Sequence, residues 1–285
     1  MAMDAGEADL RRLATWLAVL PPDARFTHVT GAALRGWQLP QLPEAAPVFV
    51  ATNEEKRRPR RLGLQVSRLT HPTGAEIRLG LPVEEPGEIL LRAARDLAHL
   101  DLVAMVDSAR RRQDVDEAAI DRVLSSSRPG VVALRKAWEE STGRCESAWE
   151  SHLYSFHRAV GVKVEPQVNL YDGEGRFVGR ADLLIVGTPF VQEYDGGVHR
   201  SLSAHRRDLR RERRFAGSPY RRRGYTAADL VHGDEQMLKE IDEMLGRPHD
   251  PTRLTRWRAL VAASCLSATG RARLSNRWLG RPPDC

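Results

Sequence analysis

Residues 180–208 read RADLLIVGTPFVQEYDGGVHRSLSAHRRD, and this stretch decides the fold that we expect for the C-terminal half of the chain. Two apolar runs within it are separated by Gly187 and Thr188, a pattern that predicts two antiparallel strands joined by a tight turn. The runs carry Asp182 and Glu193 inside otherwise apolar sequence. Buried carboxylates are costly unless a metal ion, a proton or an arginine pairs with them, so this hairpin is the first place to look for a site.

The register of this hairpin determines how the acids would lie. With Gly187 and Thr188 as a two-residue loop, Asp182 and Glu193 face each other and their Cβ atoms lie about 5 Å apart. Asp195 follows Glu193 by two residues in an extended chain and therefore shares its face. Like charges at this spacing repel, which predicts either a bound Mg²⁺, with Mn²⁺ as a substitute, or interposed arginines.

The residues around the acids favour chemistry on a phosphodiester. A bound divalent cation polarises a phosphoryl oxygen and lowers the pKa of a bound water, and His199 could take part in proton transfer. We expect a basic helix over 203–216 whose arginines would hold phosphates, although part of that charge could be a solvated face. The expected nucleic-acid contacts are Arg180, Arg200, Arg206, Arg207, Arg210, Arg211, Arg213 and Arg214.

The composition narrows the class of protein and its partner. The 285 residues suffice for two domains, and the formal net charge of +6 favours a polyanion such as DNA. No apolar run is long enough to cross a membrane, and no secretory signal is recognisable, so we expect a cytoplasmic protein with no membrane partner. The three cysteines lie far apart in sequence, which gives no basis for a structural zinc site or a disulfide framework.

Periodicity along the chain predicts a mixed α/β (α+β) protein. In the first half, short strands are expected at 48–52, 64–70 and 77–83, with the basic run 56–61 at a hairpin tip, and helices are expected after residue 86. In the second half, a helix at 146–160 precedes three strands that we expect in a central mixed sheet flanked by helices. The expected division is an N-terminal module at 1–142, a second domain at 143–232 and a helical basic tail at 233–285.

Four short motifs in the second half resemble the Vsr-like branch of the PD-(D/E)XK nuclease superfamily. They are CES at 145–147, GRADLL at 179–184, QEYDGGVHR at 192–200 and RRDLRRERR at 206–214. The resemblance implies a restriction-endonuclease-like domain and a Mg²⁺-dependent DNA endonuclease or nickase.

The same resemblance implies a role for each acidic residue. Glu146 would be the helix-borne acid, and Asp182 and Glu193 would be the metal ligands. Asp195 stands where many members of the superfamily have lysine, and His199 matches the histidine that Vsr-like enzymes place after the glycine turn. The expected catalytic set is therefore Glu146, Asp182, Glu193, Asp195 and His199.

The first half carries a second resemblance, to the AbiEi-type antitoxin module. It rests on FTHVTGAALRGWQLP at 26–40, the strands that follow, and GLPVEEPGEILL at 80–91. This resemblance implies an alternative function, a catalytically inactive DNA-binding or antitoxin-like transcriptional regulator that retains the nuclease scaffold.

Overall fold

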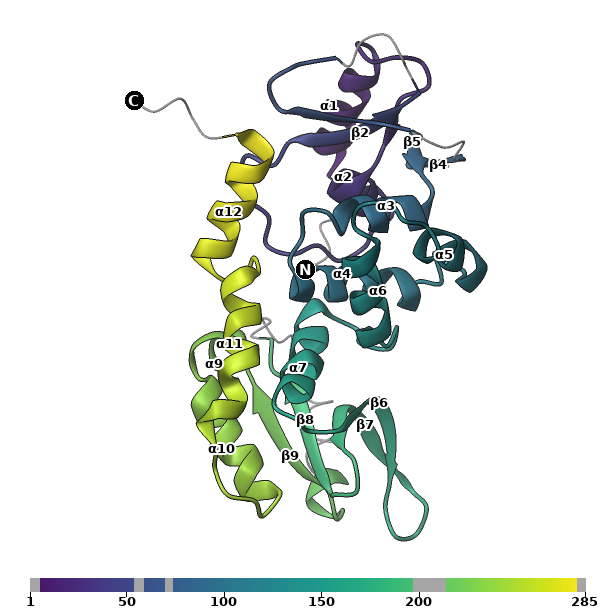
Figure 1. Cartoon of the computed structure of the whole chain (residues 1–285). Helices are drawn as coiled ribbons and strands as arrows, with labels where there is room; N and C mark the ends of the chain where they lie inside the picture. Colours follow the sequence, from purple (N-terminus) through teal and green to yellow (C-terminus); the bar gives the residue numbers. More distant parts are fainter. Residues whose placement is uncertain (1–5, 54–58, 70–73, 197–213, 281–285) are drawn as a thin grey trace. The chain divides into compact units, whose positions relative to one another are not determined.

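A computed structural model describes residues 6–53, 59–69, 74–196 and 214–280 of the chain. The chain divides into two compact units, residues 1–143 together with 260–285, and residues 144–259 (Figure 1). The boundary after residue 143 lies one residue beyond the expected one. The segment 233–285, which we expected as a separate tail, is instead shared between the two units.

The first unit contains a five-stranded sheet in the order β3-β2-β1-β5-β4. Its strands are β1 (Arg25–Phe26), β2 (Val48–Thr52), β3 (Leu64–Arg68), β4 (Ala75–Arg78) and β5 (Leu81–Glu84). The neighbours β2 and β3 are parallel, so the basic run between them is not the tip of a hairpin as we had expected. The expected strand 77–83 is two strands, because Leu79 and Gly80 both take positive φ angles, +52° and +78°, and reverse the chain between them.

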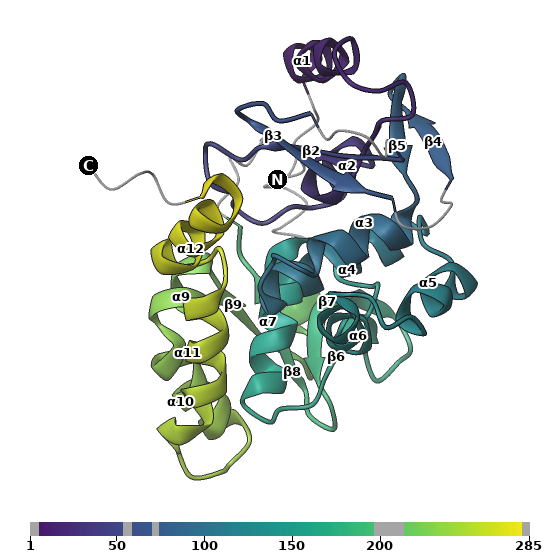
Figure 2. The same cartoon turned by 45° about the horizontal axis from the view of Figure 1, so that its top comes forward.

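Helices complete the first unit. They are α1 (Glu7–Leu17), α2 (His28–Leu34), α3 (Pro86–Ala93), α4 (His99–Arg111), α5 (Glu117–Leu124), α6 (Val131–Glu140) and α12 (Ala268–Leu279). Helices α3 to α6 follow one another on one side of the sheet (Figure 2). The core between them is apolar: Phe26, Val50 and Val83 of the sheet and Leu90 of α3 have no exposed surface.

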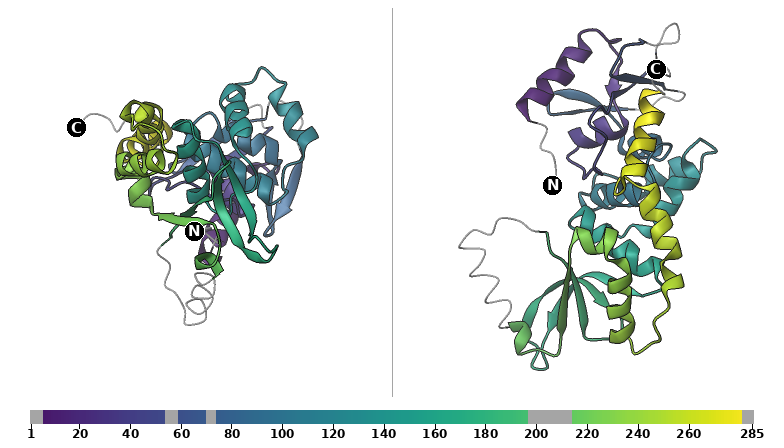
Figure 3. Two further views of the ribbon diagram at one scale, coloured as in Figure 1. Left: turned by 90° about the horizontal axis from the view of Figure 1, so that it is seen from below. Right: turned by 90° about the vertical axis from the view of Figure 1, so that its left-hand side faces the viewer.

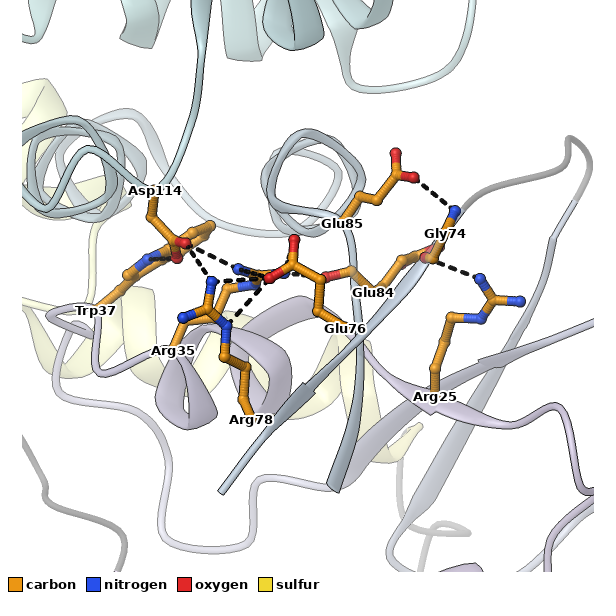
Figure 4. A network of polar contacts seen from close by, with 9 residues as sticks. All are labelled: Arg25, Arg35, Trp37, Gly74, Glu76, Arg78, Glu84, Glu85 and Asp114. Carbon is orange, nitrogen blue, oxygen red and sulfur yellow. Dashed lines mark hydrogen bonds and ion pairs between the residues drawn. The ribbon is translucent and has the colours of Figure 1, made fainter. Parts of the chain in front are cut away.

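A buried arginine ties the β4–β5 hairpin to the rest of this unit (Figure 4). The side chain of Arg35 is fully buried; its Nη1 donates to Asp114 across 2.9 Å and its Nη2 donates to the carbonyl of Glu84 across 2.8 Å. Arg78 of β4 also donates to Asp114, across 2.9 Å, and Trp37 donates to the other oxygen of the same carboxylate. These charged bonds join segments that are far apart in the sequence.

The C-terminal helix α12 belongs to the first unit through polar contacts that periodicity could not predict. Asp96 accepts hydrogen bonds from Arg277 at 2.5 Å and from the indole of Trp278 at 2.9 Å. Gln65 of β3 donates to the carbonyl of Trp278 across 2.6 Å. The aromatic ring of Trp278, only 4% exposed, fills the space beside His28 and Phe49.

The second unit contains a four-stranded sheet in the order β6-β7-β8-β9. Its strands are β6 (Val164–Tyr171), β7 (Phe177–Ile185), β8 (Phe190–Tyr194) and β9 (Arg221–Tyr225). The first three are antiparallel neighbours and β9 is parallel to β8. The strand β9 reads RRRGY, a composition that indicates a strand only weakly, and it forms at the edge of the sheet, where exposed charges are tolerated.

The helices of the second unit include part of the expected tail. They are α7 (Ala148–Ala159), α9 (Ala227–His232), α10 (Asp234–Met244), the short η1 (Pro251–Arg253) and the first part of α11 (Leu254–Ala263), a helix within which the second unit ends at residue 259. Helices α7, α10 and α11 lie on one side of the sheet (Figure 3). Trp257 of α11 is 1% exposed, donates to the carbonyl of Leu230 and packs edge-on against Phe156 of α7, with ring centroids 5.2 Å apart. Residues 233–259 thus belong to the second unit, and Trp257 is part of its core.

Candidate active site

The β7–β8 hairpin has the register that the sequence predicts. Leu184 pairs with Val191 and Leu183 pairs with Gln192, so continuing by one residue places Asp182 opposite Glu193. The turn itself differs from the expected one. Thr188 donates its backbone N–H to Ile185, and Gly187 has φ +78°, so the central turn residues are Val186 and Gly187.

Asp182 lies where the ladder between the two strands ends. Its Oδ2 accepts the backbone N–H of Tyr194 across 3.0 Å, at a position where a strand partner would otherwise accept it. The ring of Tyr194 stacks on Trp149 of α7 at 5.5 Å with an interplanar angle of 6°. The end of β8 is therefore held by both a side-chain carboxylate and an aromatic contact.

Glu193 is buried, with 4% of its surface exposed, and Arg222 of β9 supplies its countercharge. The Nε of Arg222 donates to Oε2 of Glu193 across 2.9 Å, and its Nη2 bonds the same oxygen. The guanidinium of Arg222 also lies 4.9 Å from the ring centroid of Phe215. Sequence reasoning missed Arg222, because its approach depends on the parallel pairing of a strand whose composition does not predict one.

Asp195 does not join the two acids. Its side chain is exposed and lies over Gly224 of β9, where an added Cβ would come within 2.1 Å of its Oδ2. Within residues 6–53, 59–69, 74–196 and 214–280, no group of three or more His, Cys, Asp and Glu side chains could share a metal ion. The expected convergence of three carboxylates is thus a pair, Asp182 and Glu193, in the structure.

The start of α7 offers a better-placed acid than the expected Glu146. Glu146 precedes the helix, is 39% exposed and pairs with Arg180 across 2.8 Å. Glu150, in the first helical turn, is buried, and burial raises the pKa of its carboxyl group. Its Oε2 accepts from the Glu146 backbone and from the Gln167 side chain, both at 2.8 Å.

Gln167 connects Glu150 to the sheet. It lies on β6 between the pairs Pro166↔Leu183 and Val168↔Ala181, which places it across from Asp182, and its φ of +56° is unusual for a residue other than glycine. The sequence did contain a signal for Glu150. Ser147 and Glu150 have the spacing of a capping box, and Ser147 both accepts the Glu150 backbone N–H and donates to its carboxylate.

Most of the remaining expected site residues lie outside the described part of the chain. These are His199, Arg200, Arg206, Arg207, Arg210, Arg211 and Arg213. Arg214 is described and exposed, and Arg180 is 49% exposed on β7.

Asp182 and Glu193 provide carboxylate oxygens, the type of ligand that a hard divalent cation prefers. Mg²⁺ in proteins is commonly held by one or two carboxylates, with water and substrate phosphate completing its coordination, and Asp182 and Glu193 supply such a pair from neighbouring strands. The guanidinium on Oε2 of Glu193 is a competitor for the same charge.

Comparison of this chain with known protein families, with curated proteins and with solved structures found no match. Among the described residues, no helix combines the length and the apolar character needed to cross a membrane.

Proposed function

We propose that the unit 144–259 is a Mg²⁺-dependent DNA endonuclease or nickase of the Vsr-like PD-(D/E)XK type. The observation that carries this proposal is the β7–β8 register, which makes Asp182 and Glu193 cross-strand neighbours within a mixed sheet. The second unit has the helix α7, three antiparallel strands and a fourth strand that is parallel to the third. This order is compatible with the restriction-endonuclease-like fold that the resemblance implies.

In this proposal the acids fall into two groups, the metal ligands and the acid carried by the helix. Asp182 and Glu193 would hold the cation, which when bound would polarise the scissile phosphate and activate a water. Glu150 would be the helix-borne acid, because hydrogen bonds from the Glu146 backbone and from Gln167 hold its carboxylate at the start of α7. Arg180 and Arg214, together with the arginines of 200–213, would bind flanking phosphates, and His199 would assist proton transfer.

Incubation of supercoiled and linear DNA with Mg²⁺ or Mn²⁺ tests the activity. We expect cleavage by the wild type and a rate at least about 100-fold lower for Asp182→Asn, because a lost metal ligand removes several kcal/mol of transition-state stabilisation. Glu174→Gln is the matched control, since Glu174 is an exposed carboxylate, 72% accessible, in the β6–β7 turn of the same unit. Equal cleavage by wild type and Asp182→Asn, or no cleavage of modified and unmodified DNA, would sink the proposal.

The Arg222–Glu193 ion pair favours a second candidate, a DNA-binding or antitoxin-like transcriptional regulator without catalysis. The guanidinium of Arg222 balances the buried charge of Glu193 without a metal ion. Such a pair is what we expect in a nuclease-like domain that no longer binds a metal ion. DNA binding with no Mn²⁺ site that depends on Asp182 and Glu193, measured by fluorescence anisotropy and calorimetry, would support the regulator over the nuclease.

A further inference from the structure

Arg222 occupies the carboxylate that the proposed nuclease would offer to a metal ion. Both of its described bonds to Glu193 go to one oxygen, Oε2, and both come from the same edge of the guanidinium, Nε and Nη2. Glu193 is 4% exposed, so its charge needs a partner whenever no metal is bound. Arg222 is a described partner of this charge in the structure.

The position of Arg222 also allows it to leave. Its side chain is 29% exposed, and it reaches Glu193 from the edge strand β9, where its backbone pairs with Val191 and not with Glu193 itself. Phe215 lies beside the guanidinium, with its ring centroid 4.9 Å away, and would support the side chain without fixing it by a second charge. A side chain at a sheet edge can rotate into solvent with little change of the backbone.

Two cations on one carboxylate oxygen repel each other strongly in a poorly hydrated site. A divalent ion that binds Glu193 would therefore have to displace the guanidinium. Once displaced, Arg222 would remain near the site as an unpaired cation able to reach a substrate phosphate.

We propose that Arg222 is a resident counter-cation of Glu193 that a divalent metal ion must displace, so that this arginine sets the metal affinity of the site. This inference rests on the proposed metal-dependent function. It assigns Arg222 as a positioning residue for the metal-free state, a role that nothing in the sequence motifs indicates.

The chain offers a matched control one residue away. Arg223 carries the same charge and lies on the same strand, β9. It donates two hydrogen bonds to the carboxylate of Glu240 in α10, at 2.7 Å and 2.6 Å, and has no described contact with Glu193. Arg223→Gln therefore removes one positive charge from β9 while leaving the counter-cation of Glu193 in place.

Isothermal titration of the full-length chain with Mn²⁺ alone is the test. We expect Arg222→Gln to bind Mn²⁺ at least about ten-fold more tightly than the wild type, because the competing charge is gone. Arg223→Gln should bind as the wild type does, and adding Asp182→Asn to Arg222→Gln should abolish the tight site. Unchanged or weaker binding by Arg222→Gln, with a wild-type site that depends on Asp182, would overturn this inference and leave the proposed nuclease standing.

A thermal-unfolding readout separates the remaining outcomes. The metal-free Arg222→Gln variant should melt below the wild type, and saturating Mn²⁺ should raise its melting temperature by more than it raises that of the wild type. If Arg222→Gln does not fold, Arg222→Lys should show the same changes to a smaller degree, since lysine keeps the charge but lacks the fork of donors. Absence of any Asp182-dependent Mn²⁺ binding in all of these variants would overturn both the inference and the proposed metal-dependent function.

Discussion

The backbone N–H of Tyr194 donates to Oδ2 of Asp182 across 3.0 Å, so β8, the strand that carries Glu193, also orients the other acid of the pair. The bond satisfies a donor at the point where the ladder between β7 and β8 ends. Asp182 thus has a structural task in addition to any task in binding a metal ion.

This relationship predicts that two substitutions of Asp182 differ in stability. Asp182→Asn keeps a side-chain oxygen that can accept the Tyr194 N–H, whereas Asp182→Ala leaves that donor without this partner, at a cost of about 1–3 kcal/mol. Urea denaturation of the metal-free protein should show the alanine variant as the less stable of the two. Equal free energies of unfolding for both variants would contradict this interpretation of the hydrogen bond.

A second prediction separates the two acids at the start of α7. Glu150 is buried and hydrogen-bonded to Gln167, whereas Glu146 is 39% exposed and paired with Arg180. We expect the rate of DNA cleavage by Glu150→Gln to be at least about ten-fold below the rate of Glu146→Gln, because only Glu150 is hydrogen-bonded to the sheet. A larger loss from Glu146→Gln would restore the assignment made from the sequence motif.

Asp101 gives a prediction about pH and stability. Burial raises the pKa of its carboxyl group from 3.8 to about 6, although the Cys265 backbone N–H donates to both of its oxygens. Because the folded state holds this proton more tightly than the unfolded state, the stability that the group contributes is present below about pH 4 and is lost as pH rises to about 6. The shift corresponds to roughly 3 kcal/mol.

Asp101→Asn should remove this pH dependence. We expect the variant to gain stability relative to the wild type between pH 4 and pH 7, measured by chemical denaturation at each pH. A stability difference between wild type and Asp101→Asn that stays constant across this range would show that Asp101 does not titrate in it.

The fourth prediction concerns the extent of the second unit. Trp257 is 1% exposed and packs on Phe156, so a fragment that ends at residue 232 lacks part of its core. We expect residues 144–259 to fold as an isolated fragment with a cooperative thermal transition, and residues 143–232 to lack one. Trp257→Ala in the longer fragment should cost about 3–5 kcal/mol. Cooperative unfolding of the shorter fragment would show that the boundary expected from sequence was sufficient.

Much of the second unit could be predicted from local sequence. The apolar runs of β7 and β8 and their tight turn determined a hairpin, and the alternation of side chains then determined that Asp182 faces Glu193. The spacing of apolar residues likewise placed α7 and α10. These features depend on residues close to one another in the sequence, so the spacing of apolar side chains is enough to predict them.

Only the tertiary structure decided which distant groups meet. The parallel pairing of β9 with β8 brings Arg222 to Glu193, and the burial of Glu150 against Gln167 selects it over Glu146. Likewise, Asp96 and Gln65 bind the end of α12 and make it part of the first unit. Such contacts form between residues far apart in the chain, and the countercharge that a buried carboxylate finds depends on packing that no local pattern encodes.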